Sequence, residues 1–423
     1  MKKYKKIRAG FIALIVIYFA VLLVLRSGLI GSPEKKLEEI ENVGESFDEL
    51  EIPEGIKVVG IGEATHGNCE FQTAKLEMLQ KLVETGKCHS IAFEMSAGEA
   101  AEYNDAIHNN EAVLADLIGK TDYPIYDTKQ MVELLQWMRD FNKDKSYEES
   151  VVFYGVDMQG PDREVGYLLE YSNRHPEAFS EEEKDTLSEM ATNSDCPYEE
   201  YKDFFTALDK RLSAENDAEL RGLAILSRVV TEWIDAPSFE ADEKKYSAHR
   251  DLCMAKNLKS YYELETERGY SQILVTAHNG HVMRGDAEGF GNVGMGSRID
   301  EIFEGSYFCV GTGFYNTCVN VHTAGTYDDE YLREDHNYCS SDILAYQAKF
   351  FEGERYCLDF TKVTDKNSKV YKCIHTPAFM GSFGEGYNKW QDFSRAYRSK
   401  LVQGDRFDAV IYYYNATPIR TLH

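Results

Sequence analysis

The sequence predicts an α/β protein with a largely parallel central sheet flanked by helices. Short apolar runs typical of buried strands alternate with longer segments whose apolar residues recur at helical spacing. Such alternation is typical of parallel sheets whose strands are connected by helices. The chain has 423 residues, 43% of them hydrophobic, which is enough for one large domain of this class.

Seven runs are expected to form strands. They are rich in Val, Ile, Phe and Tyr, and polar or glycine-containing segments bound them. In chain order they are residues 57–62, 89–94, 150–157, 271–277, 307–311, 355–359 and 409–414.

Helices are expected between the early strands. Residues 70–84 show helical spacing, and Gly86 is a typical helix stop. Residues 97–118 and 130–142 have the same kind of pattern. From about residue 162 to 268 the sequence is helical and acidic, with no convincing strand. We therefore expect a helical insertion within the α/β domain.

The N-terminus predicts a membrane anchor, with a signal peptide as the alternative. Lys2–Arg8 is basic and Phe11–Leu25 is wholly apolar, and no clean small-residue cleavage site follows. We expect residues 1–30 to form a single-pass anchor whose basic end stays in the cytoplasm, so that the body is extracytoplasmic. A secreted protein is the alternative. Residues 31–50 are expected to be a tether to a domain at 51–423.

Composition and motifs exclude several classes of function. The formal net charge of -26 argues against nucleic-acid binding, which needs clustered cations. The nine cysteines form no Cys-x-x-Cys pair, so a zinc ribbon is not supported. The sequence has neither the Gly-x-Ser-x-Gly motif of serine hydrolases nor a phosphate-binding Walker loop.

Titratable side chains end four of the expected strands. Parallel strands bind their ligands beyond their carboxyl ends, so neighbouring strands would gather these side chains at one rim. In strand order they are Glu63 and His66, then Glu94, then Asp157, and finally His278 with His281.

This set suits general-base hydrolysis. A neutral imidazole can take a proton from water, and a nearby carboxylate can orient that imidazole. Further cations can stabilise the oxyanion that forms at a carbonyl. Together with the family resemblance given below, this set leads us to expect His66 as the water-activating base, with Glu63, Glu94 and His278 in the catalytic set. Substrate-binding roles are expected for Lys75, Asp157 and His281; Lys75 lies nine residues after His66, in the following helix.

Two other functions use the same residues. His66, His278, His281 and Glu94 are plausible zinc or iron ligands, although no His-Glu-x-x-His motif is present. We rank a metal-dependent hydrolase below metal-free catalysis and predict no cofactor. The second alternative is a non-catalytic module that binds a ligand in the cell envelope. Arg250 and Asp251 are expected to form a helix-surface ion pair or to support the site.

Several short motifs, in this order and spacing, resemble the erythromycin esterase family. The likeness runs from about residue 51 to 417. The matching segments include Gly62–Gly67, Ile91–Glu94, Trp137–Asn142, Phe153–Asp157, Arg250–Ala255, Ala277–His281, Met295–Arg298 and Phe407–Val410.

The resemblance implies metal-independent hydrolysis of the lactone ester of macrolide antibiotics, with His66 activating water. Glu63 and Glu94 would support the base or hold substrate, and His278 and His281 would complete the site. The family carries an arginine where this chain has Lys75, and lysine lacks the planar bidentate fork of arginine. An outward-facing enzyme would meet either a macrolide or an ester of the cell envelope.

Overall fold

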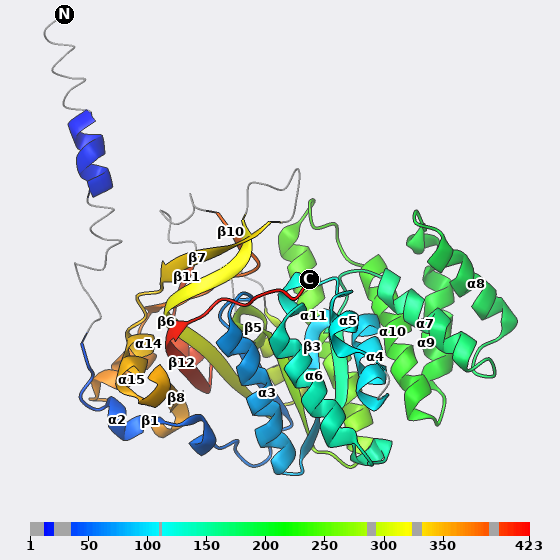
Figure 1. Ribbon diagram of the computed structural model, residues 1–423, viewed down its shortest axis with the longest axis horizontal. Helices are drawn as coiled ribbons and strands as arrows, with labels where there is room; N and C mark the ends of the chain where they lie inside the picture. Colours follow the sequence, from blue (N-terminus) through cyan, green and yellow to red (C-terminus); the bar gives the residue numbers. More distant parts are fainter. Residues whose placement is uncertain (1–11, 21–34, 110–111, 286–292, 324–331, 389–396) are drawn as a thin grey trace, which may run out of the picture.

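A mixed sheet of ten strands, with helices packed on both of its faces, forms the centre of the molecule (Figure 1). The computed structural model describes residues 12–20, 35–109, 112–285, 293–323, 332–388 and 397–423. The predicted α/β class, a multi-stranded sheet flanked by helices, is confirmed.

Four parallel neighbours form the functional half of the sheet. They are, in spatial order, β2 (Val58–Glu63), β5 (Gln272–His278), β3 (Cys88–Ser96) and β4 (Val152–Asp157). All four were expected as strands, and their parallel adjacency brings their carboxyl ends to one edge. Glu63 lies in register with His278 on the adjacent strand.

In the other half, antiparallel strands join a sheet whose pairings are otherwise parallel, so the sheet is largely parallel as predicted and mixed only at its added strands. β6 (Tyr307–Thr323) runs parallel to β2, and β12 (Ala409–Ala416) runs parallel to β6. The antiparallel additions are β8 (Arg355–Asp359) on β12, β1 (Gly44–Glu45) on β8 and β7 (Arg333–Cys339) on β6. β10 (Gly386–Tyr387) is a short parallel partner of β6, and β9 (Ala378–Gly381) pairs with β11 (Arg398–Leu401) in a separate sheet.

Both faces of the sheet bury apolar side chains. Along β2, Val59 and Ile61 belong to one buried core and Val58 to the other, as expected of a strand covered on both sides. The first core includes residues of α3 (Cys69–Glu84) and α6 (Lys129–Asn142), and the second includes residues of α11 (Glu243–Glu267) and α13 (Met295–Ile302). The expected helix at 97–118 is two helices, α4 (Ala97–His108) and α5 (Leu114–Ile118).

The expected insertion at 162–268 consists of helices. It comprises α7 (Asp162–Arg174), α8 (Glu181–Thr192), α9 (Lys202–Ser213) and α10 (Ala218–Ile234) before α11. Residues 162–267 are all described, and they contain no strand. Figure 1 shows α7 to α10 grouped at one end of the molecule, beside α4. The remaining short helices are α2 (Ile40–Val43), α12 (Asn279–Val282), α14 (Ile343–Gln347) and α15 (Lys369–Ile374).

The predicted tether at 31–50 is wrong for the residues described from 35 onward. This segment packs on the body, where β1 pairs with β8 and the side chains of Leu37, Ile40 and Leu50 are buried. Polar residues separate these three apolar side chains, so the sequence shows no apolar run that would have indicated their burial.

The predicted membrane anchor at 1–30 lies outside the described residues except for 12–20, which are helical. No described helix combines the length and the apolar character needed to cross a membrane.

Gly98 allows α4 to lie against α7. A Cβ at this position would stand 2.4 Å from the carbonyl carbon and oxygen of Arg163, which cannot move without the helix. We expect Gly98→Ala to lower the free energy of unfolding by about 1–3 kcal/mol, measured by urea denaturation. Gly166→Ala, inside α7 where an added Cβ meets nothing within 4 Å, should instead raise it by about 0.5–1 kcal/mol. Equal effects of the two changes would contradict this account of the packing.

Candidate active site

A cavity of about 1020 Å³ opens beyond the carboxyl ends of the parallel strands. Its walls come from the end of β5, the turn after β2, the start of α11 and the segments around β9 and β11. The lining includes His66, Glu94, Tyr123, Arg250, His278, His281, Glu385, Tyr397 and Phe407. All seven residues predicted for the site belong to one cluster. Four of them line this cavity, and the other three, Glu63, Lys75 and Asp157, are buried behind its wall.

A clamped turn holds His66 at the end of β2. The amide of Ala64 donates to the Thr312 hydroxyl at 2.9 Å, and its carbonyl accepts from the amide of Phe383 at 2.8 Å. The carbonyl of Gly67 accepts from the amides of Asn320 and Ile419, at 3.1 and 3.0 Å. Because distant segments bind both sides of the turn, the backbone of His66 is fixed before any ligand arrives.

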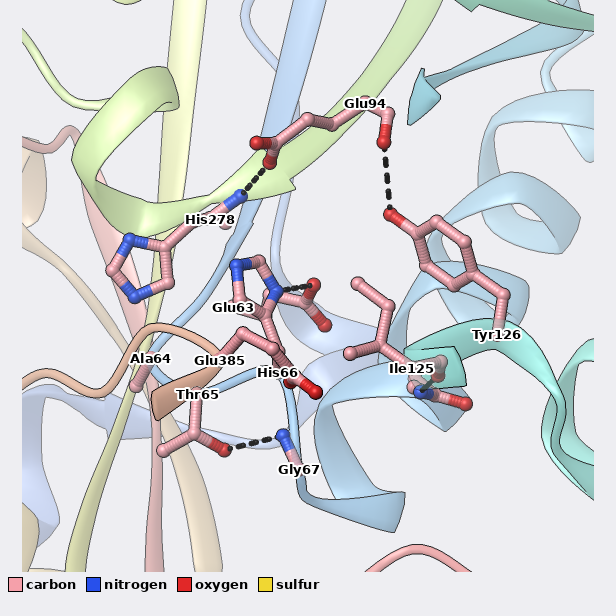
Figure 2. Close-up of polar contacts among 12 residues, drawn as sticks. Glu63, Ala64, Thr65, His66, Gly67, Glu94, Ile125, Tyr126, His278 and Glu385 are labelled. Carbon is pink, nitrogen blue, oxygen red and sulfur yellow. Dashed lines mark hydrogen bonds and ion pairs between the residues drawn. The ribbon is translucent and has the colours of Figure 1, made fainter. Parts of the chain in front are cut away.

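Glu63 orients the His66 imidazole. Its Oε1 lies 2.8 Å from Nδ1 of His66, a contact drawn in Figure 2. Burial raises the pKa of the Glu63 carboxyl, but the Lys75 ammonium and the His66 hydrogen bond outweigh burial and lower that pKa to about 2. Glu63 is therefore ionised at neutral pH and accepts a hydrogen bond from Nδ1–H, which leaves Nε2 of His66 as the nitrogen with the free lone pair. Nε2 has no hydrogen-bond partner among the described residues.

Lys75 lies below this pair and not in the cavity wall. Its Nζ is 3.0 Å from Oε2 of Glu63, and the side chain is only 2% exposed. The ammonium also stands 5.1 Å from the ring centres of both Phe93 and Tyr126. We expected Lys75 to contact the substrate, but in this position it does not reach the cavity, because its ammonium is buried against Glu63.

Arg250 links the carboxylates that end β3 and β4. Its guanidinium donates to Asp157 through Nε at 2.9 Å and Nη2 at 2.5 Å, and Nη2 also donates to Oε1 of Glu94 at 2.6 Å. Asp157 is fully buried and is absent from the described lining, so its partner is Arg250 rather than a bound ligand. Burial raises the pKa of Glu94, but the charges of His281 and Arg250 hold it well below its usual value.

His281 has a carboxylate on each side. Its Nδ1 lies 2.6 Å from Asp251, and its Nε2 lies 3.3 Å from Oε1 of Glu94. Burial lowers the pKa of His281, but Glu94 and Asp251 outweigh burial and raise it to about 9. His281 is therefore an imidazolium at neutral pH, with its charge at the cavity wall.

His278 is held through its backbone. Its amide donates to Oε2 of Glu94 at 2.9 Å (Figure 2), and its ring centre lies 5.0 Å from that of His66. Gly62, in β2, lets the residue after His278 pack closely against that strand, because a Cβ on Gly62 would stand 2.3 Å from Oδ1 of Asn279. The position of His278 thus depends on a glycine in the neighbouring strand.

Glu385 is a site residue that the sequence did not predict, and Arg250 and Asp251 were expected either as a surface ion pair or as support for the site. Arg250 and Asp251 do not form the expected surface pair with each other. Arg250 pairs with Glu94 and Asp157, and Asp251 pairs with His281 of α12, so both support the site. Their one sequence signal was a charged pair on a helix that also carries apolar residues. Glu385, which contacts Arg333, gave no signal.

The proposed metal ligands are engaged in other contacts. His281 and Glu94 bind Asp251 and Arg250, and His66 binds Glu63. In the part of the chain that the structure describes, no group of three or more His, Cys, Asp or Glu side chains is arranged to hold a metal ion.

The sequence model of erythromycin esterases matches residues 83–416. The chain belongs to the erythromycin esterase family. This membership confirms the resemblance and suggests a hydrolase. The match begins after His66, so the first strand and its turn lie outside it. A comparison with curated proteins finds no match.

Solved structures share the fold. A Bacillus cereus protein has a TM-score of 0.71 at 18% identity, covering 91% of this chain and 98% of its own. A protein described as a succinoglycan biosynthesis protein has a TM-score of 0.70 at 16% identity, covering 94% and 98%. A mutant of the erythromycin esterase EreC in its open conformation has a TM-score of 0.59 at 15% identity, covering 86% and 91%. At such identities the likeness shows the fold alone.

Lys75→Met should strongly destabilise the protein, because it leaves the Glu63 carboxylate buried without its cation. We expect the free energy of unfolding, from urea denaturation at pH 7, to fall by about 3–5 kcal/mol. The double variant Glu63→Gln/Lys75→Met buries no charge at this pair and should recover most of the loss. Lys129→Met removes an exposed lysine that pairs with Glu133 and should change little. A double variant no more stable than Lys75→Met would contradict the pairing.

Proposed function

We propose that this protein hydrolyses a carboxylic ester, with the lactone of a macrolide as the leading substrate class. His66 activates the attacking water in this proposal. The observation that carries it is the contact between Nδ1 of His66 and the ionised Glu63 carboxylate, with Nε2 left over at a cavity wall. A carboxylate that fixes the imidazole in this tautomer also stabilises the imidazolium that forms when Nε2 takes a proton.

The charges below His66 support this role. Lys75 keeps Glu63 ionised, and an ionised Glu63 compensates the positive charge that His66 gains during the reaction. A carboxylate held neutral by burial could not do so. The Lys75–Glu63 pair therefore acts on the base and has no direct contact with substrate in the proposed reaction.

The reaction balances without an added reactant. His66 takes a proton from water at Nε2 while the water oxygen bonds to the ester carbonyl carbon, and the carbonyl electron pair moves onto its oxygen. The tetrahedral intermediate then collapses, and the bond to the leaving alkoxide breaks. The His66 imidazolium returns its proton to that alkoxide, which gives a carboxylic acid and an alcohol.

The cavity supports a bulky substrate. Its volume of about 1020 Å³ lies at the upper end of the range for sites that enclose drug-sized ligands. Aromatic side chains at Tyr123, Tyr397 and Phe407 supply apolar surface around the charged centre. A large cyclic ester fits this combination better than a short acyl ester, although both carry the same reacting group.

The test uses the full-length protein with erythromycin and with 4-nitrophenyl acetate, in water enriched in ¹⁸O. Hydrolysis by an activated water puts one ¹⁸O atom into the acid product, which mass spectrometry detects. His66→Asn keeps an amide that can donate to Glu63 but cannot take up a proton. We expect this change to lower kcat by roughly 10²–10⁴-fold.

His375→Asn is the matched control, because this exposed histidine stacks on Tyr371 away from the cavity and should leave the rate unchanged. Full activity in His66→Asn would refute the base. A rate that chelators abolish and added zinc or iron restores would favour the metal-dependent hydrolase. Tight binding of erythromycin with no product from any ester would favour the binding module.

We also propose that residues 1–30 anchor the enzyme with its body outside the cytoplasm. The basic Lys2–Arg8 segment before the apolar Phe11–Leu25 run supports this orientation. The full chain should stay with membranes after an alkaline wash, and protease added outside the cytoplasmic membrane should digest its body. Val16→Arg/Phe19→Arg should release the protein from the membrane, since each arginine costs about 2.5–3.5 kcal/mol at the centre of a span. A wild-type protein found only inside the cell would contradict this topology.

A further inference from the structure

We propose that His278 is the oxyanion donor of this site: a neutral imidazole that binds the substrate's carbonyl oxygen through its Nε2–H and exchanges no proton. The inference rests on the proposed function, because it assigns the negative charge of the tetrahedral intermediate to a particular atom. It separates the two neighbouring histidines by role, with His66 as the base and His278 as a hydrogen-bond donor.

The backbone determines the tautomer of His278. Nδ1 of its ring accepts a hydrogen bond from the amide of Gly280 at 3.2 Å. A nitrogen that accepts an N–H uses its lone pair and carries no proton, so the proton of the neutral ring must be on Nε2. His278 therefore presents Nε2 as a donor.

This donor has no acceptor in the described part of the protein. Nε2 of His278 is buried and without a hydrogen-bond partner there, although the residue belongs to the cavity wall. A buried unpaired donor costs about 1–3 kcal/mol, so its retention calls for an explanation. A substrate oxygen that gains charge during the reaction is an acceptor of the required kind.

The ring remains neutral over the working pH range. Burial and the nearby His66 lower the pKa of His278 to about 4. The ring therefore neither takes the proton of the attacking water nor competes with His66. Neutral imidazoles that polarise a carbonyl without giving up a proton have precedent in enzymes.

The surrounding charges hold the donor in place. The amide of His278 donates to Glu94, Glu94 accepts from Arg250, and Arg250 is fixed by Asp157. These buried contacts give Glu94 and Asp157 a positioning role. The ring centres of His66 and His278 lie 5.0 Å apart, and the proposal assigns the water to the first ring and the carbonyl oxygen to the second.

The first test reads the tautomer directly and needs no substrate. Two-bond ¹H–¹⁵N correlation spectra of the full chain, labelled in histidine, should show His278 as the neutral Nε2–H form from pH 8 down to about pH 4. Methyl phenylphosphonate, a stand-in for the tetrahedral oxyanion, should move the Nε2–H resonance downfield. A proton on Nδ1, a charged ring at pH 7 or an unmoved Nε2–H resonance with the phosphonate bound would overturn the inference.

The second test separates a donor from a structural residue. His278→Leu fills the space without a donor and should lower kcat by roughly 10²–10³-fold with little change in KM. His278→Gln keeps an N–H near the position of Nε2 and should recover part of that loss. Equal rates in both variants would overturn the inference.

The two proposals can fail separately. If no ester is hydrolysed, the proposed function fails while the spectra still decide the state of His278. If esters are hydrolysed and His66→Asn is inactive but His278 carries its proton on Nδ1, only the inference about the donor fails.

Discussion

The parallel register of β2, β5, β3 and β4 is the constraint on which the site depends. β2, β4 and β5 end with an acid or a histidine, and Glu94 lies near the end of β3. The register brings these side chains to one edge, with Glu63 directly beside His278. A shift of one residue in any strand would turn its terminal side chain to the opposite face of the sheet. Fully buried strands with apolar residues on both faces resist such a shift, because both cores would lose their packing.

The charges gathered by this register are costly to bury, and the fold arranges them in pairs. Glu63 faces Lys75, Glu94 and Asp157 face Arg250, and Asp251 faces His281. Pairing of this kind is worth little as net stability, since desolvation offsets much of the attraction. Its effect is to fix which groups are ionised at neutral pH. The same cluster thus contains an ionised Glu63, a cationic His281 and a neutral His278.

Much of this architecture could be predicted, because strand ends leave a local signature. The apolar runs before Glu63, Glu94, Asp157 and His278 identified the four parallel strands that hold the site, and the helical spacing at 162–268 identified the insertion. The edge strands β1, β7 and β10 escaped prediction because short or polar edge strands lack an apolar run. The packing of residues 35–50 on the body was not predicted, because only three isolated apolar side chains in this segment are buried.

Four residues of the cavity wall could be named from the sequence, namely His66, Glu94, His278 and His281, but the contacts between site residues could not. Side chains at strand ends could be grouped by topology alone, whereas the partner of Lys75 depends on which way its helix faces. Arg250 is 93 residues from Asp157 and 156 from Glu94, so no local spacing could connect them. Ion pairs between different helices and strands depend on the tertiary structure, and a single sequence contains no local pattern that predicts them.

The segment around residues 417–419, which binds the turn that holds His66, has a consequence for how the protein is synthesised. The amide of Ile419 binds Gly67, and that of Thr417 binds Glu70, a partner 347 residues earlier in the chain. At 5–20 residues per second, a ribosome needs on the order of 20–70 s to reach the second partner after making the first. Throughout that interval, the turn around His66 lacks the contacts that residues 417 and 419 supply.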